Sequence, residues 1–297
     1  MSDNQAKRYR TTMMSHPYGY GLFQPPEYSR LHPGMLGYLD EYSLWHPLLD
    51  LTDANGVEAA GFDPVEPQIL SDPDRCRWRP LESNTVKMDE YKLESEADAL
   101  ALALPVDIGG IVEYSTSKDF GAILMCDDTI ESQGFDLREP FLTWLKKHSK
   151  VLLAKWPDLR KHGVIAATWT YSASKVNIQT WQSKETKITL GFTVGATGIG
   201  SLGPEKTWHR ARSSSGWSSW NGDKRVVFFT GLRIRYNIFG AWEREEKKWR
   251  GSKEDEFFIP ELEVGECAEA EVERFGDDWE DIQRDEEEEN NTDWLSS

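Results

Sequence analysis

One stretch decides the fold of this chain: residues 162–203, which read HGVIAATWTYSASKVNIQTWQSKETKITLGFTVGATGIGSLG. Apolar side chains fall at alternate positions in both halves of this stretch. Such alternation is typical of strands with one apolar and one polar face. The polar residues 182–185 between the halves suit a hairpin turn. The sequence therefore predicts a long hairpin, whose apolar face carries Ile165, Trp169, Tyr171, Ile188, Leu190, Phe192 and Val194.

Both strands of this predicted hairpin are long. Each runs to about nine residues or more, whereas strands in globular domains average about five or six. A strand needs roughly 9–11 residues to cross a bilayer. The pattern therefore fits two structures: a long hairpin in an ordinary twisted sheet, and a hairpin that is able to insert into a membrane.

The alternation changes phase near Ser174 and Lys175, because Val176 and Ile178 fall on the face opposite Trp169. A shift of one residue sends side chains to the other face of a sheet. We therefore expect a β-bulge at this point, or a strand that is buried differently at its two ends. Such a strand would be packed in a sheet and would have to rearrange before insertion.

The net charge of −17 is unevenly distributed along the chain. Residues 1–137 carry 10 basic and 24 acidic side chains, residues 138–250 carry 21 and 8, and residues 251–297 carry 3 and 19. A basic middle is suited to phosphate-bearing surfaces, either nucleic acid or anionic lipid. The acidic arms either mask that middle within the same chain or serve only solubility.

Composition limits the class of protein. No run of about 18 apolar residues exists, so we expect no transmembrane helix, and the N-terminus has no apolar segment of a secretory signal. Cys76, Cys126 and Cys267 are too widely spaced for a disulfide framework or a metal pair. A cytoplasmic location is therefore expected.

Turn signals and alternation predict further elements on either side of the central stretch. Residues 53–80 and 213–223 read as loops. Helices are expected at 94–104 and 138–161, and strands at 35–39, 43–51, 106–115, 121–126, 207–212 and 225–239. The fold class predicted is α+β: a twisted, mostly antiparallel sheet with long β-hairpins, a few packed helices and an acidic C-terminal tail.

Two basic surfaces are candidates for contact with anionic lipid. The predicted helix 138–161 carries Lys146, Lys147 and Lys150 on its polar side. The alternative to lipid contact is that these lysines form an ordinary solvated face of a helix packed on the core. In the predicted strand 225–239, Arg233 and Arg235 alternate with apolar residues and give that strand one basic face.

The acidic tail contains apolar residues at three- and four-residue intervals, among them Val272, Phe275 and Trp279. This spacing predicts an amphipathic helix that docks on the body of the chain. The acidic run 285–289 beyond it is expected to be disordered. The alternative is a tail that only aids solubility.

Motifs for catalysis are almost absent from the sequence. Residues 198–203 match G-x-G-x-x-G, but a dinucleotide site needs a helix there and the sequence instead predicts a strand after Pro204. The histidines are scattered without metal-site spacing, and no nucleophile motif occurs. We therefore expect no enzyme activity, no cofactor and no metal site, and no nucleic-acid recognition motif is present.

The order of elements resembles the pore-forming domain of gasdermins, especially the fungal gasdermin-like proteins of allorecognition, heterokaryon incompatibility and regulated cell death. The segments that carry the resemblance are EPFLTWLKKH at 139–148, the strand at 163–181, its partner KITLGFTV at 187–194, and YSLWHPLLDL at 42–51. It covers roughly residues 35–250 and is one of pattern, since that family has no invariant catalytic motif.

The resemblance implies a division into a pore-forming domain at 1–250 and an acidic, autoinhibitory segment at 251–297. It implies a cytoplasmic, autoinhibited protein that binds anionic phospholipids through the basic residues named above. The active form would be a homo-oligomer at the plasma membrane, with β-hairpins inserted as a membrane barrel. Activation would come from a protease that cuts within 240–262, or from pairing with a related gasdermin-like chain.

Two departures from the family pattern qualify this implication. The N-terminus is rich in proline and aromatic residues where animal members begin with an amphipathic helix, and the C-terminal segment is short. A different class of function also remains open, a non-enzymatic β-rich binding module whose basic face meets nucleic acid or an acidic protein. Nucleic acid is the less expected of the partners.

Overall fold

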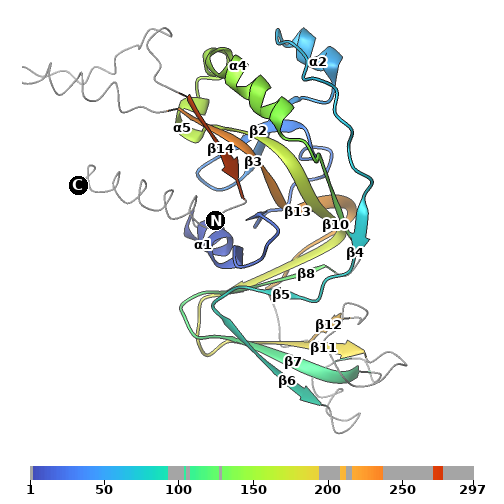
Figure 1. Ribbon diagram of the computed structural model, residues 1–297. Coiled ribbons are helices and arrows are strands. Elements are labelled where there is room, and N and C mark those ends of the chain that lie inside the picture. Colours follow the sequence, from blue (N-terminus) through green and yellow to red (C-terminus); the bar gives the residue numbers. More distant parts are fainter. Residues whose placement is uncertain are drawn as a thin grey trace, which may run out of the picture.

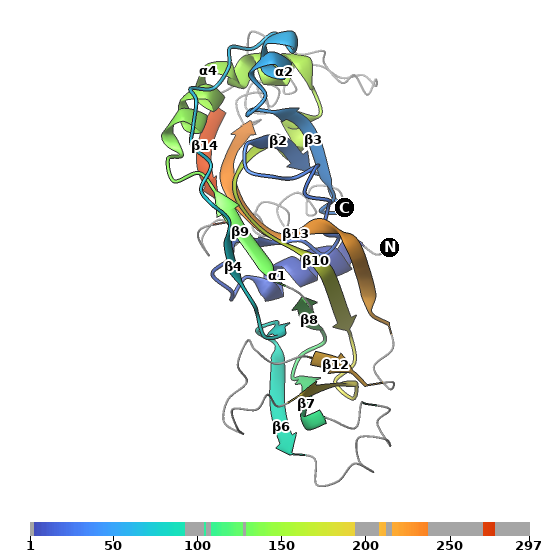
Figure 2. The same ribbon diagram turned by 90° about the vertical axis from the view of Figure 1, so that its right-hand side faces the viewer.

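The computed structural model describes residues 3–92, 104, 108–126, 129–193, 208–211, 216–236 and 270–276. Antiparallel strands form two sheets, and a few helices pack around the larger one (Figure 1). The larger sheet, here called the proximal sheet, curls strongly along its longest strands (Figure 2). The predicted fold class is confirmed.

The helices are α1 (Asp3–Met13), α2 (Ala54–Ala59), α4 (Glu139–Lys155) and α5 (Leu159–His162). The strands are β1 (Tyr20–Gly21), β2 (Met35–Leu39), β3 (Trp45–Asp50), β4 (Asp74–Cys76), β5 (Leu81–Glu82), β6 (Val86–Lys92), β7 (Ile108–Thr116), β8 (Gly121–Cys126), β9 (Ile130–Gly134), β10 (Val164–Trp181), β11 (Lys187–Thr193), β12 (Trp208–Arg210), β13 (Ser218–Tyr236) and β14 (Ala270–Phe275).

The proximal sheet is organised around β10. One edge of β10 pairs with β13 from Val164 to Ile178. The other edge pairs in turn with β2, β9 and β8. This strand therefore holds together segments that are far apart in the sequence.

Bulges interrupt the pairing of β10 with β13. Register shifts occur at three places, and one of them lies between Ala173 and Lys175. The β-bulge predicted from the change of phase near Ser174 is therefore confirmed. Because each bulge adds to the local twist and bends its strand, the three together account for the curl of the sheet.

The smaller, distal sheet has the strand order β12–β11–β7–β6. Four strands of the proximal sheet connect along the chain to these four distal strands. They lie side by side in the matching order, β13–β10–β8–β5. Each distal strand is continuous in sequence with its proximal counterpart. The distal sheet and these four proximal strands thus form one four-stranded ribbon that folds over on itself (Figure 1). We call the fold in this ribbon the crease. It consists of the connections 83–85, 117–120 and 182–186, together with the partly described link from β12 to β13.

The prediction that the two halves of residues 162–203 pair as a hairpin is wrong. β10 lies in the proximal sheet, whereas β11 pairs with β7 and β12 in the distal sheet. A turn does form, since the Thr186 N–H donates to the Ser183 carbonyl at 3.2 Å, but it carries the chain across the crease. Alternation specifies that a strand has two faces; it does not specify the neighbour of that strand.

The same correction applies to the predicted strand pair 106–115 and 121–126. β7 and β8 also lie on opposite sides of the crease, in different sheets. The true hairpins are longer: one combines β5 and β6 with β7 and β8, and the other combines β10 and β11 with β12 and β13.

Buried hydroxyls hold the crease where two of its connections meet. The Thr85 hydroxyl donates to the Phe120 carbonyl at 2.6 Å, and the Thr116 hydroxyl donates to the same oxygen at 3.0 Å. The Ala122 N–H donates to the Ser83 hydroxyl at 3.1 Å. At the crease, hydrogen bonds from side chains thus take the place of the regular backbone hydrogen bonds between strands.

Helix α4 covers one face of the proximal sheet, as its sequence predicts. Phe141, Leu145 and Leu152 are buried against Val164 and Ile234 of β10 and β13. Trp156 caps the helix directly before Pro157, which cannot continue it.

Truncating this contact is expected to lower stability. Leu152 is fully buried, so Leu152→Ala should cost about 2–5 kcal/mol of unfolding free energy. Its neighbour Val151 is 49% exposed, and Val151→Ala should change the free energy by no more than about 0.5 kcal/mol. Urea unfolding of both variants measures the difference, and equal losses would contradict the packing of α4 on the sheet.

The structure corrects three further predictions. Residues 3–13 form helix α1, although no helix was expected there; Ala6, Tyr9 and Met13 give it a packing face. The loop predicted at 213–223 is strand from Ser218 onward. The region 53–80 also contains α2 and β4.

Several predictions lie outside the described residues. These are the helix at 94–104 apart from Leu104, the glycine motif at 198–203, the acidic run 285–289, Val194 and Trp279.

Candidate membrane-active surface and its tail

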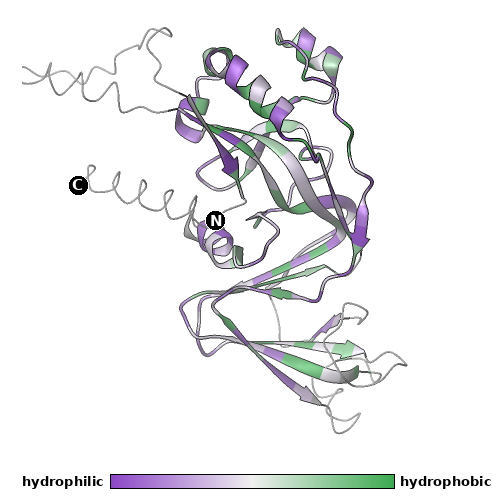
Figure 3. Cartoon of the chain, viewed as in Figure 1, coloured by the Kyte–Doolittle hydropathy of each residue, from purple (hydrophilic) through white to green (hydrophobic). Residues whose placement is uncertain are grey.

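The distal sheet has one mainly apolar and one mainly polar face; Glu90 is the exception on the first, and Tyr91 and Ile111 are the exceptions on the second. Met88 of β6, Tyr114 of β7 and Leu190 of β11 point to the same side, toward the crease. The residues next to them, such as Asp89 and Glu113, lie on the other side. Figure 3 shows hydrophobic and hydrophilic residues together along these strands.

The apolar core inside the crease takes residues from both sides of the fold line. Ile123, Met125 and Trp181 come from the proximal sheet. The distal sheet contributes Val112, Tyr114, Ile188, Leu190 and Phe192, with Val86, Met88 and Trp208 packed against them. The crease thus encloses one apolar core that is built from both sheets.

The predicted membrane-inserting residues are divided between the two sheets. Ile188, Leu190 and Phe192 are buried together in the crease. Ile165 is instead buried in a different core of the proximal sheet. The structure therefore does not bring the predicted set together.

Trp169 and Tyr171 are half-buried on β10, also in the proximal sheet. The Trp169 indole N–H donates to the Ser132 hydroxyl at 2.8 Å. Sequence reasoning missed Val86, Met88, Val112 and Tyr114 as members of the apolar face. The alternation in 86–92 and 108–116 was the signal that could have found them.

On the polar face, an ion pair joins two distal strands. Lys187 Nζ of β11 lies 2.9 Å from Glu113 Oε2 of β7. The hydrogen bond and charge of Glu113 raise the pKa of Lys187. Opposite charges across adjacent strands favour this register of the ribbon.

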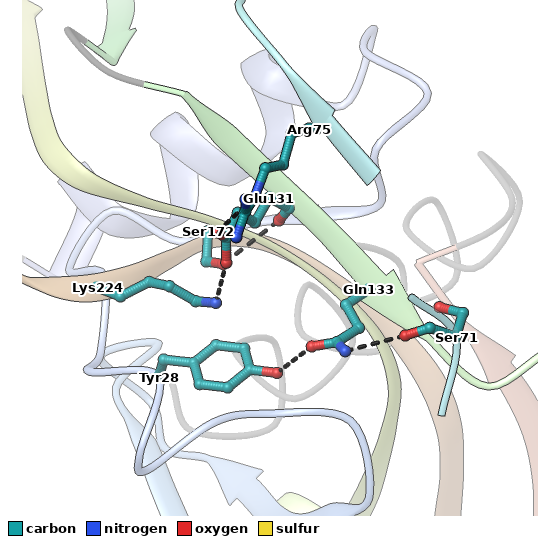
Figure 4. A network of polar contacts seen from close by, with 7 residues as sticks. All are labelled: Tyr28, Ser71, Arg75, Glu131, Gln133, Ser172 and Lys224. Carbon is teal, nitrogen blue, oxygen red and sulfur yellow. Dashed lines mark hydrogen bonds and ion pairs between the residues drawn. The ribbon is translucent and has the colours of Figure 1, made fainter. Parts of the chain in front are cut away.

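A polar network fixes the proximal sheet where it bends (Figure 4). Glu131 of β9 accepts hydrogen bonds from Lys224 of β13 and from Arg75 of β4, the latter at 3.0 Å. The Ser172 hydroxyl of β10 donates to the Glu131 carbonyl at 3.3 Å. Four strands are joined through this one residue.

Gln133, two residues along β9, extends the network. Its side-chain oxygen accepts from the Tyr28 hydroxyl at 2.8 Å, and its amide group donates to the Ser71 carbonyl at 2.9 Å (Figure 4). These bonds attach two loops to β9. The network therefore stabilises the proximal sheet as a body separate from the crease.

This network predicts a pH dependence of stability. The hydrogen bond from Lys224 holds the pKa of Glu131 below its ordinary value. Because the folded-state pKa is depressed, the stabilisation is complete above the unfolded-state pKa of about 4.3 and is lost as the pH falls through the folded-state pKa. Glu131→Gln should therefore be less stable than the native chain at pH 7, and the gap should close as the pH falls below about 4.3.

Urea unfolding of both chains between pH 7 and pH 3 tests this expectation. A gap that stays constant over the whole range would show that the charge of Glu131 does not contribute.

The three lysines predicted for lipid contact lie on the exposed side of α4. Lys147 Nζ pairs with Asp63 at 2.6 Å. Among the described residues, no ion pair includes Lys146 or Lys150, which are exposed. These two lysines remain open to solvent on the helix that covers the proximal sheet.

The arginines predicted for lipid contact are covered instead. Arg235 Nε donates to Glu273 Oε1 of β14 at 2.5 Å, and both side chains are largely shielded from solvent. The Arg233 guanidinium lies 5.7 Å from the ring centre of Phe275. The basic face of β13 thus exists, but the acidic tail occupies it.

The tail docks as a strand, so the amphipathic helix predicted there is wrong for residues 270–276. β14 pairs antiparallel with β13, from Gly231 opposite Phe275 to Tyr236 opposite Ala270. Val272 lies at the register position opposite Ile234. A free strand edge offers a row of backbone partners that sequence periodicity does not reveal.

Phe275 is the tail residue with the clearest packing. It is 6% exposed and stacks on Tyr20 with 5.1 Å between ring centres, and it packs at a tilt against Phe229 with 5.3 Å between ring centres. Its predicted contact with the body is therefore present, although as part of a strand.

No helix in the described ranges has the length and apolar character needed to cross a membrane. Within those same ranges, His, Cys, Asp and Glu form no cluster of three or more that suits a metal ion.

Comparisons with known proteins give little. No protein-family model matches the chain, and no curated protein matches it. Among solved structures, it is similar to the gasdermin A3 membrane pore determined by cryo-electron microscopy, with 11% identity and a TM-score of 0.29 over 80% of this chain and 92% of that chain. So low an identity and TM-score do not establish a shared fold or activity.

Proposed function

We propose that this protein is a gasdermin-like pore-forming effector of regulated cell death. In its inactive form it is cytoplasmic and its tail is docked. After release of the C-terminal segment 251–297, the domain 1–250 binds anionic phospholipid at the plasma membrane, oligomerises, and inserts its two long hairpins. The activator is a protease that cuts within 240–262, or a related chain.

The folded-over ribbon is the observation that carries this proposal. Opening the crease would turn four short distal strands and their proximal counterparts into one continuous four-stranded sheet. β7 and β8 together span 108–126, which exceeds the roughly 9–11 residues that a membrane strand needs. In its distal half that sheet would carry Val112, Tyr114, Ile188 and Leu190 on one face and Lys87, Glu113 and Lys187 on the other, the division that a strand between lipid and water requires. Its proximal strand β8 is apolar on both faces.

Exposed strand edges are not tolerated in lipid, so the opened ribbon would need neighbours. The outer strands β12 and β6 pair on one side only within the distal sheet. Identical ribbons from further copies would supply the missing partners and satisfy every backbone group. Insertion therefore implies a homo-oligomer.

The charges supply the lipid contact and its control. Lys146 and Lys150 are exposed on α4, whereas Arg233 and Arg235 contact Phe275 and Glu273 of the neighbouring strand β14. Loss of the tail removes a segment with 3 basic and 19 acidic residues and uncovers the arginines. Polybasic surfaces gain about 1 kcal/mol per charge near an anionic leaflet.

Dye release from vesicles tests the proposal. The full chain with an engineered protease site in 251–262 is folded, then cut, and added to vesicles with and without anionic lipid. Release from anionic vesicles only after the cut is the expected result. Salt-dependent binding of nucleic acid by the cut chain, with no release from any vesicle, would favour a binding module instead.

A further inference from the structure

We propose that the edge of β13 from Gly231 to Tyr236 is a peptide-binding site, and that β14 is its exchangeable ligand. The ligand class is an extended acidic segment with the pattern Glu-x-Phe-Gly, supplied by the tail of this chain or of a second copy. The inference rests on the proposed function only in that a cut between β13 and β14 frees the ligand.

The backbone provides the acceptor. β13 pairs with β10 along one edge, and the opposite edge is shared between β1 and β14. β1 takes only Phe228 and Phe229, so the acceptor segment starts directly beyond it. Addition of a strand to such an edge is a recognised mode of peptide binding, in which the main chain gives affinity and side-chain sites give specificity.

Arg235 is the first specificity determinant. It donates to the Glu273 carboxylate at 2.5 Å, and the two side chains are 19% and 12% exposed. A charge-assisted hydrogen bond in so shielded a place is stronger than one at the surface. The site should therefore select a carboxylate at this position of the strand.

An aromatic pocket is the second determinant. Tyr20 stacks on Phe275, Phe229 packs against it at a tilt, and the Arg233 guanidinium lies over the same ring. The two determinants lie two residues apart, on one face of the docked strand. They read the Glu273-x-Phe275 part of the pattern.

The glycine that follows is the third determinant. Gly276 has φ +83°, a backbone conformation that side chains disfavour. A Cβ atom there would lie 3.1 Å from the Phe229 carbonyl oxygen and 3.1 Å from the Tyr20 nitrogen. Glycine is therefore the residue that leaves the edge with least strain at the point where β1 begins.

Cutting the chain and releasing the tail are therefore separate steps. While residues 237–269 connect β13 to β14, the tail acts at an effective concentration of about millimolar. A cut removes that advantage but none of the contacts. The tail then dissociates on dilution or exchanges with another copy of itself.

Peptide binding to the cut chain tests the inference without any membrane. The probe is a fluorescent peptide of residues 268–278, AEAEVERFGDD, and fluorescence anisotropy measures its affinity. The Glu273→Arg peptide should bind about 10- to 100-fold more weakly. The Phe275→Ala peptide should bind about 150- to 5000-fold more weakly. The uncut chain is the matched control and should bind the native peptide at least about 100-fold more weakly, because its own tail fills the site.

A charge swap makes the test specific. The cut Arg235→Glu chain should lose the native peptide and recover the Glu273→Arg peptide, while circular dichroism shows an unchanged fold. Binding that ignores Glu273 and Phe275, or a cut tail that excess peptide never displaces, would overturn the inference. A cut chain that binds the peptide as expected but never releases dye would sink the pore proposal alone.

Discussion

Met88→Lys should abolish dye release by the cut chain while leaving the protein folded. Met88 lies on the apolar face of β6, half-buried at the margin of the crease core, so the folded state tolerates a longer polar side chain there. On the lipid face of a membrane strand, a lysine costs about 2–4 kcal/mol near the midplane. That cost corresponds to a loss of about 30- to 1000-fold for each inserted copy.

Its neighbour Asp89 provides the matched control. Asp89 is exposed on the polar face of the same strand, opposite Glu113. Asp89→Lys adds even more positive charge but leaves the apolar face intact, so release from anionic vesicles should persist. If Asp89→Lys abolished release and Met88→Lys did not, the opposite face would be the one in lipid.

Phe275→Ala should activate the uncut chain. Removal of a buried aromatic side chain costs about 3–5 kcal/mol, and here that cost falls on the docked state of the tail. The fraction of chains with a free tail should therefore rise by about 150- to 5000-fold. Vesicle dye release by the uncut variant measures this rise.

Arg274 is the control for this prediction, since it is exposed beside Phe275 on β14. Arg274→Gln should leave the uncut chain inactive. Equal dye release by both variants would contradict this prediction. So would an absence of release from Phe275→Ala when its tail is free, because tail docking would then not be what inhibits the protein.

The sequence predicted the elements better than it predicted their partners. The bulge beside Ser174 and the helix α4 were readable, because both depend on local spacing. The neighbour of β11 was not, because alternation in residues 187–193 is satisfied equally by β10 or by β7. The choice depends on a core that draws Ile123 and Tyr114 from segments far away in the chain.

The tail shows the same limit. Val272 and Phe275 have helical spacing, but the open edge of β13 offers backbone hydrogen bonds that a helix would not make. The basic face of β13 was readable from the alternation of Arg233 and Arg235. The contact of Arg235 with Glu273 could not be predicted, because the periodicity of each segment does not show which distant segment pairs with it.

The most direct measurement of the central proposal concerns β6 on vesicles. Cys76, Cys126 and Cys267 are replaced by serine or alanine, single cysteines are placed at Val86, Lys87, Met88 and Asp89, and each carries an environment-sensitive dye. After the cut, quenchers attached to the lipid tails should quench the dye at 86 and 88 and spare it at 87 and 89. Equal exposure of all four positions to water during dye release would contradict the opening of the crease.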